Sequence, residues 1–189
     1  MKKLFAIALA ILFSCSILQA QESEFNLGDK VLSLGVGIGN TLYASSSYYS
    51  MGVPPISFSY EQAIKDDVLE NGVIGIVGSI GYTSFKSTWN FSGFEYGWKY
   101  SNIYFGAGGS FHYPLLDKLD TYAALMLGYN ISTTKEYGTN PGDDFSGSYG
   151  GFQFAGFVGA RYYFTDQFAA FAQVGYGIAY LTFGVSRRL

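Results

Sequence analysis

From residue 30 to residue 189, apolar side chains alternate with small or polar ones along the chain. In the first such stretch, Leu32, Leu34 and Val36 are separated by Ser33 and Gly35. A period of two residues is typical of β-strands whose two faces differ in chemistry. Groups of Gly, Ser, Asn and Asp separate the stretches, as turn residues do. The pattern therefore predicts an all-β fold built from two-faced strands.

The alternation predicts eight strands, each long enough to cross a membrane at a tilt, which takes ~9–11 residues. They fall at about 30–42, 55–64, 72–84, 98–113, 120–131, 149–164, 168–177 and 180–189. The connections 43–54, 85–97 and 132–148 are longer than those after the second, fourth and sixth strands. Short turns at one end and long loops at the other are typical of outer-membrane barrels. We expect an eight-stranded antiparallel up-and-down transmembrane β-barrel.

The first twenty residues have the pattern of a secretory signal. Lys2 and Lys3 precede the apolar run 4–13, and Ala20 offers a small residue before a cleavage point. That run is too short to cross a bilayer as a helix. We expect residues 1–20 to be a cleaved signal peptide and residues 21–189 to form one barrel domain, with 21–29 a loosely ordered lead-in. A loose lipoprotein box ending at Cys15 is the alternative reading of this segment.

The composition fits a wall that faces lipid. Charged residues make up 13% of the 189-residue chain and aromatic residues 19%, whereas ordinary soluble domains are roughly 25% charged. The formal net charge is −3 and no basic cluster is present. These features disfavour a nucleic-acid partner.

The two faces of the strands differ consistently. In the strand at 55–64, Ile56, Phe58 and Tyr60 share one face, and Ser57 and Glu61 lie on the other. A soluble barrel would carry many charges on its wet face, but here the polar face is mostly Gly, Ser, Thr, Ala and Gln. Small residues suit the narrow interior of an eight-stranded barrel. We therefore expect the aliphatic face to contact lipid.

The interior is predicted to hold a polar cluster near one end of the barrel. Glu61, Arg161 and Arg188 fall on the inward face, and we expect them to pair, since an unpaired buried charge is costly. The cluster is extended by Gln153, Gln173, Asn102 and His112. A structural plug is the favoured interpretation, and a gated pore is the alternative.

Three segments, 28–37, 159–164 and 174–185, resemble strands of small outer-membrane β-barrel proteins, the outer-membrane protein X/W-like and OmpA-barrel-like family. The resemblance implies residence in the outer membrane of a Gram-negative cell and insertion by the barrel assembly machinery. The family includes integrity, adhesion and small-solute roles. Such chains usually end in an aromatic residue, whereas this one ends Arg187-Arg188-Leu189.

Catalysis is not expected. The only histidine is His112, and no serine follows it by two residues, as a lipid deacylase of this type would require. With one histidine and no cysteine after residue 20, a zinc site is poorly supplied, and we expect no metal and no cofactor.

The predicted long loops are rich in aromatic side chains, which are enriched in contact surfaces. The contact candidates are Tyr43, Tyr48, Tyr49, Trp89, Phe91, Phe94 and Tyr96. The third to sixth strands are also expected to project past the lipid as an open edge that a foreign strand can join. These features favour an envelope-structural or adhesive protein. Its expected partners are outer-membrane lipid, lipopolysaccharide and an extracellular protein. The alternative is a narrow channel for small or apolar solutes.

Overall fold

The computed structural model describes residues 23–39, 49–91, 94–138 and 146–189, and the side chains of Phe91 and Phe94 are not included in that description. The predicted signal peptide therefore lies outside the described residues. In the part of the chain that is described, there is no helix with the length and hydropathy needed to cross a membrane.

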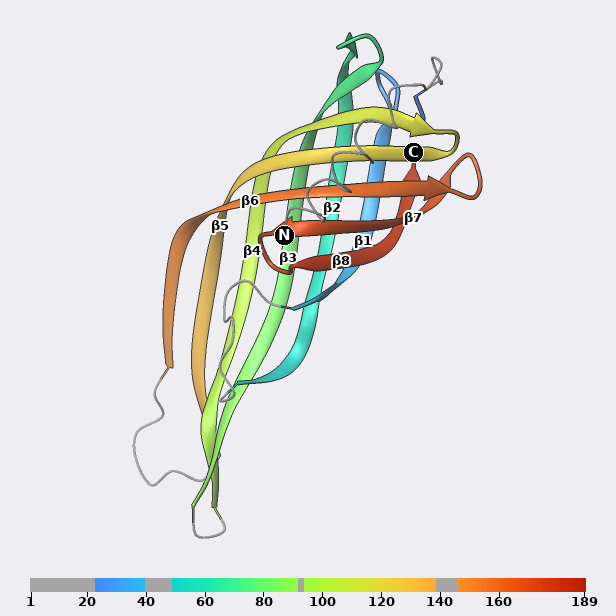
Figure 1. The fold of residues 1–189 in the computed structure, drawn as a ribbon. Coiled ribbons are helices and arrows are strands. Elements are labelled where there is room, and N and C mark those ends of the chain that lie inside the picture. Colours follow the sequence, from blue (N-terminus) through green and yellow to red (C-terminus); the bar gives the residue numbers. More distant parts are fainter. Residues whose placement is uncertain (1–22, 40–48, 92–93, 139–145) are drawn as a thin grey trace, which may run out of the picture.

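Each strand pairs antiparallel with its neighbours in the chain, and β1 pairs with β8 to close a barrel (Figure 1). The strands are β1 (Lys30–Ile38), β2 (Ser50–Val68), β3 (Gly72–Phe91), β4 (Phe94–Leu116), β5 (Leu119–Gly138), β6 (Ser146–Tyr163), β7 (Phe168–Tyr176) and β8 (Leu181–Arg188). The predicted all-β class and the eight-stranded up-and-down topology are confirmed.

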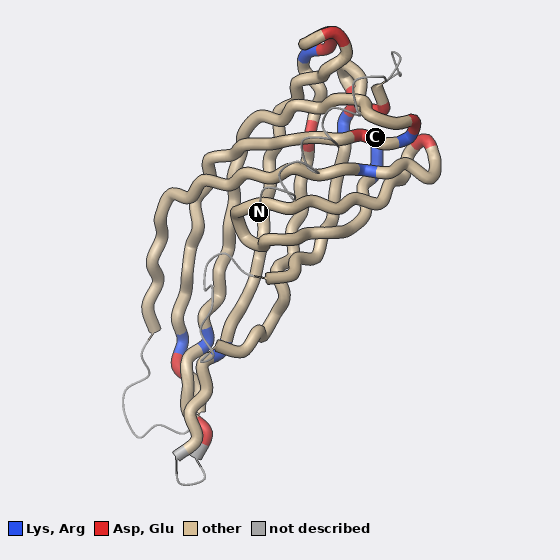
Figure 2. The backbone as a smooth tube through the Cα atoms, viewed as in Figure 1, with Lys and Arg blue, Asp and Glu red and all other residues tan. Residues whose placement is uncertain are grey.

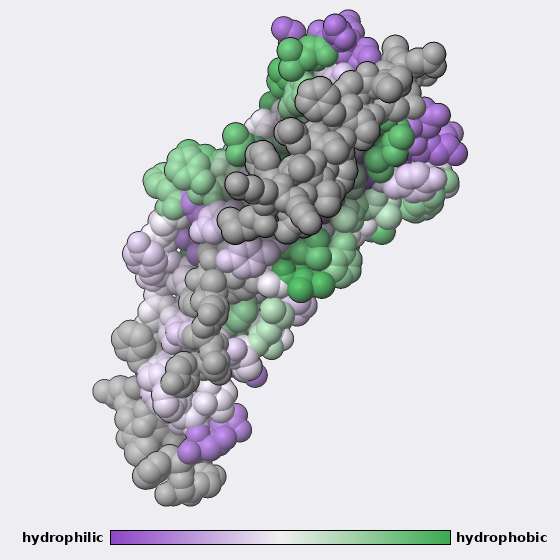
Figure 3. All heavy atoms as spheres, viewed as in Figure 1, coloured by the Kyte–Doolittle hydropathy of each residue, from purple (hydrophilic) through white to green (hydrophobic). Residues whose placement is uncertain are grey.

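The strand faces point as predicted, with the aliphatic side outward. In β1, Val31 is fully buried, whereas Leu34 and Ile38 are 53% and 56% exposed. Leu125 on β5 is 77% exposed. Figure 2 shows that charged residues gather at the two ends of the barrel, and Figure 3 shows hydrophilic residues at both ends of the visible face. An apolar band between two charged ends is the surface that a bilayer requires.

Several connections are shorter than the sequence suggested. The expected loop 85–97 is wrong, because β3 runs to Phe91 and β4 starts at Phe94, which leaves only residues 92–93 between them. The third long connection is 139–145 rather than 132–148. The reason is local: Thr and aromatic residues continue to alternate with polar ones beyond the apolar band, and Thr and aromatic residues favour strands. The first connection is 39–49 instead of 43–54, because β1 ends at Ile38 and β2 begins at Ser50.

The barrel is strongly lopsided. The strands β3, β4, β5 and β6 have 20, 23, 20 and 18 residues, whereas β1, β7 and β8 have 9, 9 and 8. The long strands therefore continue past the closed ring as an open sheet, seen at the lower left of Figure 1. We call the residues 82–91, 94–103, 131–138 and 146–150 of this sheet the projecting wall. Among the described residues, 146–155 of β6 pair only with β5, so this side of the wall is an edge.

Candidate functional site

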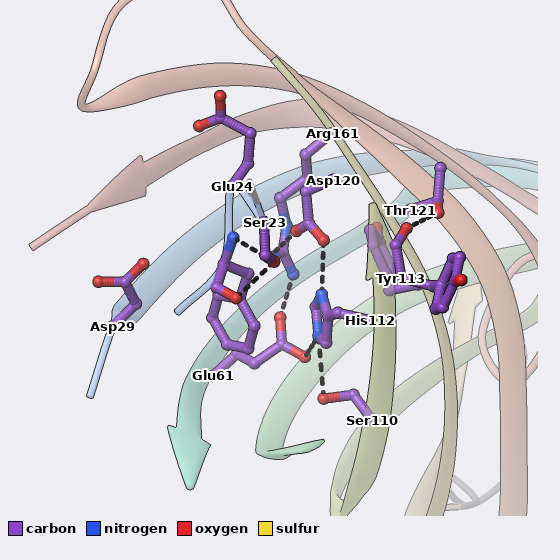
Figure 4. A network of polar contacts seen from close by, with 12 residues as sticks. Ser23, Glu24, Asp29, Glu61, Ser110, His112, Tyr113, Asp120, Thr121 and Arg161 are labelled. Atoms are coloured by element: carbon purple, nitrogen blue, oxygen red, sulfur yellow. Dashed lines mark hydrogen bonds and ion pairs between the residues drawn. The ribbon is translucent and has the colours of Figure 1, made fainter. Parts of the chain in front are cut away.

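Four ionisable side chains meet inside the barrel, at the end opposite the projecting wall. Glu61 comes from β2, His112 from β4, Asp120 from the start of β5 and Arg161 from β6. The four residues are between 0% and 4% exposed. Figure 4 shows their side chains pointing toward one another, and we call this group the ionic ring.

The contacts of the ionic ring form a closed circuit. Arg161 donates from Nη1 to Asp120 Oδ2 at 3.0 Å and from Nη2 to Glu61 Oε2. His112 contacts the same two carboxylates, with Nδ1 2.7 Å from Asp120 Oδ1 and Nε2 2.9 Å from Glu61 Oε1. Only the protonated imidazole can donate from both nitrogens. In that form two cations balance two anions, which is the condition under which buried charges are tolerated.

Aromatic rings enclose the ionic ring. The Phe25 ring lies 4.1 Å from the His112 ring, and the Arg161 guanidinium lies 4.6 Å from the Tyr122 ring centroid. Phe25 is fully buried, so the expected loosely ordered lead-in is wrong for residues 23–29. The cause is the burial of one apolar side chain, which fixes the short segment around it. The N-terminal segment thereby closes this end of the barrel.

Glu61 and Arg161 pair as predicted, but Arg188 does not join the ionic ring. The prediction that all three residues form one cluster is therefore wrong for Arg188. Arg188 lies 3.2 Å from Glu24 Oε2 and 3.7 Å from Asp29 Oδ2. Its guanidinium also covers the Tyr163 ring at 4.2 Å. The reason is its place at the end of β8, opposite Val31 of β1, where the N-terminal segment supplies nearer carboxylates.

The other predicted interior residues line the barrel above the ionic ring. Gln173 accepts a hydrogen bond from the Tyr122 hydroxyl at 3.1 Å, which ties it to the aromatic enclosure. Gln153 donates to the Gly177 carbonyl at 2.6 Å, and Asn102 is 1% exposed. An interior cavity of about 60 Å³ is lined by Gln173 together with Tyr122 and Arg161. A space of this size holds a few water molecules.

The Ser110 hydroxyl lies beside His112, so that Ser110, His112 and Asp120 follow one another as in a serine–histidine–acid catalytic triad. Its Oγ lies 3.2 Å from His112 Nε2, and Asp120 holds Nδ1. However, Glu61 Oε1 lies closer to the same Nε2, at 2.9 Å, so this nitrogen is not available as a base toward the serine. Ser110 is 4% exposed and His112 is fully buried. The geometry supports a structural ring and gives no support to an acyl-transfer site.

Asp120 and Tyr122 were missed in the sequence, although a signal was present. Both fall on the inward face of β5 with Ala124 and Met126, two residues apart, as in any strand. Extending the inward face to residue 120, the first residue of the predicted strand 120–131, would have placed Asp120 inside. Phe25 gave a weaker signal, as a single aromatic residue in a polar segment.

The predicted contact residues are only partly described. Tyr43 and Tyr48 lie outside the described residues, and Phe91 and Phe94 form the last pair of the β3–β4 hairpin. Trp89 is 52% exposed and sits opposite Tyr96. Tyr96 donates to Glu136 Oε1 at 2.8 Å, and so does Trp98, which is not among the predicted contact residues, at 3.0 Å. The hydrogen bond to the Glu136 carboxylate raises the pKa of Tyr96 above its ordinary value, and partial desolvation of the phenol acts in the same direction.

The aromatic residues continue the inward face of the barrel onto the projecting wall. Tyr49 packs edge-on against Tyr100, with ring centroids 5.4 Å apart. Trp98 and Tyr100 share this face with Asn102 and His112, from which they are separated by even numbers of residues. Tyr149 on β6 is 77% exposed. Most of the predicted loop 85–97 is thus β-sheet, with aromatic side chains on its inward face.

Comparisons with known proteins support the fold. No protein-family model and no curated protein matches the sequence. Among solved structures, the N-terminal β-barrel domain of Pseudomonas aeruginosa OprF is 15% identical, with a TM-score of 0.51 over 89% of this chain and 100% of that one. Ail, the attachment invasion locus protein of Yersinia pestis, solved with the heparin analogue sucrose octasulfate, is 16% identical, with a TM-score of 0.50 over 86% of this chain and 96% of that one.

Proposed function

We propose that this chain, which has the eight-stranded barrel fold of the small outer-membrane proteins, is a non-enzymatic protein of the Gram-negative outer membrane. In this proposal its barrel is sealed and structural, and its projecting wall makes contacts outside the cell. Export through a cleaved signal peptide at 1–20 and insertion by the barrel assembly machinery are parts of the proposal.

The size of the apolar band supports placement in a bilayer. On β5 the outward side chains from Thr121 to Ile131 carry no charge. Ten residue steps of about 3.3 Å, tilted by about 40°, rise about 25 Å, which matches the apolar belt of outer-membrane barrels. Membrane fractionation followed by a detergent gel tests this placement. We expect outer-membrane recovery and heat-modifiable migration. Protein that stays monodisperse without detergent would contradict it.

The closed interior supports a structural barrel over a solute channel. The ionic ring and Phe25 fill one end, and the interior cavity that Gln173 and Tyr122 line has a volume of about 60 Å³. A planar-bilayer recording of the reconstituted protein tests the alternative. We expect no steady current. A persistent ion-selective current would favour the channel.

The observation that carries the contact role is the aromatic inward face of the projecting wall. It presents Trp89, Tyr96 and Trp98 on β3 and β4 and Tyr149 on β6, whose outer edge pairs with no described strand over 146–155. Aromatic side chains supply much of the energy of protein contacts, and an open strand edge offers main-chain groups to a foreign strand. The aromatic residues and the part of the edge at 146–149 lie beyond the apolar band, where they are accessible from outside.

Shortening the hairpin tests the contact role. In the variant, an Asn-Gly turn replaces residues 89–96, so that Thr88 and Gly97 remain paired. The matched control carries Asn90→Ser and Glu95→Gln in the full-length hairpin. We expect cells that display the short hairpin to attach less to host-matrix-coated surfaces than cells that display the control. If both kinds of cell attach equally, the contact role is refuted and only the structural role of the barrel remains.

A further inference from the structure

Three lysines stand in a row across the outer face of the projecting wall. Lys86 of β3 lies directly opposite Lys99 of β4, which lies directly opposite Lys135 of β5. All three are exposed. Lys99 is four residues from the lipid-facing Ile103, and Lys135 is eight from Leu127, so the row shares the outward face of the barrel.

On the outer face, the side chains change from apolar to hydroxyl to positively charged in successive rows toward the lysines. The pair Tyr82 and Ile103 belongs to the last apolar row. The next row consists of the hydroxyl side chains of Ser101, Thr133 and Ser148 on three neighbouring strands, and Ser84, opposite Ser101, is buried. The lysine row follows, two residues further along each strand. The order is hydrocarbon, hydroxyl and then positive charge, which is the order of groups that an anionic lipid presents from its chains to its headgroup.

The distance of the lysine row from the opposite end of the barrel also matches the thickness of a bilayer with its headgroups. From Leu119, beside the short β4–β5 turn, to Lys135 there are sixteen residue steps on β5. At about 3.3 Å per step and a tilt of about 40°, these rise about 40 Å, close to the full thickness of a bilayer with its headgroups. If the turn lies at one surface, the lysine row lies in the headgroup region of the other.

The lysine charges are not neutralised by the described part of the chain. The ion pairs among described residues involve Arg161, Arg188 and His112, and none reaches a lysine of the row. Lys86 lies over the Tyr137 ring at 5.6 Å. Like charges directly opposite each other destabilise a sheet. A row of three therefore calls for an anionic ligand that offsets the repulsion.

We propose that Lys86, Lys99 and Lys135 bind the phosphate groups of a phosphorylated glycolipid in the outer leaflet. This inference rests on the proposed outer-membrane placement. A phosphate monoester carries nearly two negative charges and three strong acceptor oxygens, which suits several ammonium donors in one row. In the hydroxyl row beneath, Ser101, Thr133 and Ser148 offer donors and acceptors to the sugar and acyl-linkage groups, and the apolar rows receive the acyl chains. The row is thus a lipid-binding site on the barrel's outer wall.

Native mass spectrometry of the full protein released from nanodiscs tests the site. The discs contain phosphatidylcholine with either bisphosphorylated or dephosphorylated lipid A. We expect the wild type to retain the bisphosphorylated form at least about tenfold more than the dephosphorylated one, as expected for a charge-dependent site. The row variant K86Q/K99Q/K135Q should lose this preference. The control K30Q/K65Q/K118Q removes three exposed lysines at the other end and should keep it.

Retention of lipid A by the row variant at the wild-type level would overturn the site, as would equal retention of both lipid forms by the wild type. Release of the lipid by excess inorganic phosphate would identify free phosphate as the ligand and also overturn it. If the row variant fails to fold, the retention of the two lipid A forms by the wild type decides whether the site exists. The variant K86R/K99R/K135R keeps the three charges and should keep the preference for the bisphosphorylated form. Wild type that does not insert into lipid would instead refute the outer-membrane proposal itself.

Discussion

Arg161→Met tests whether the ionic ring stabilises the barrel. Arg161 is the cation that donates to both Asp120 and Glu61, which are each 3% exposed. Each hydrogen bond to a charged group contributes about 1.5–3 kcal/mol. Removing one member of a buried ion pair costs about 3–5 kcal/mol, since it leaves a charge without its partner. His112 still neutralises one carboxylate, so we expect a loss of about 4 kcal/mol in the free energy of unfolding.

The measurement is equilibrium urea unfolding in lipid vesicles, followed by circular dichroism and by the gel mobility of folded and unfolded forms. The matched control is Arg187→Met, at the same end of the barrel, where the exposed guanidinium lies 5.8 Å from the Phe168 ring. It should change stability by less than about 1 kcal/mol. The triple variant R161M/E61Q/D120N should regain part of the loss, because no unpaired anion remains. A folded Arg161→Met barrel that loses less than about 1 kcal/mol would refute this account of the ring.

Three further predictions concern the wall and its closed end. Leu125→Arg should cost about 2–4 kcal/mol on refolding into lipid, and Leu116→Arg, near the turn, about 0–1 kcal/mol; equal costs would refute the orientation of the outer face. Phe25→Ala should cost about 3 kcal/mol in urea unfolding, because a fully buried ring is lost; no change would mean that the N-terminal segment does not seal the barrel. Gly108→Ala, whose new Cβ meets the Leu125 carbonyl of the neighbouring strand, should cost about 1–3 kcal/mol by the same assay, whereas Gly109→Ala meets nothing closer than 3.8 Å and should be nearly neutral.

Much of the architecture could be predicted because it depends on local alternation. The two-residue period in β1 assigns Leu34 to the outer face and Ser33 to the interior, whatever strand lies beside it. The lengths of β3 and β4 were harder to predict. Alternation continues beyond the apolar band, but its outer residues are Lys86, Thr88 and Lys99, so the pattern no longer separates an exposed strand from a loop.

The sequence by itself determined the number of strands, their order and the face that each side chain occupies, because these follow from residue types two positions apart. Only the tertiary structure decided which inward charges meet. Glu61 and Arg161 are 100 residues apart and touch across the lumen, whereas Arg188 turns to the N-terminal segment. The row of Lys86, Lys99 and Lys135 likewise arises from the register of three strands. Pairing register and ring closure depend on the sum of many contacts over the whole sheet, and no local stretch of residues encodes them.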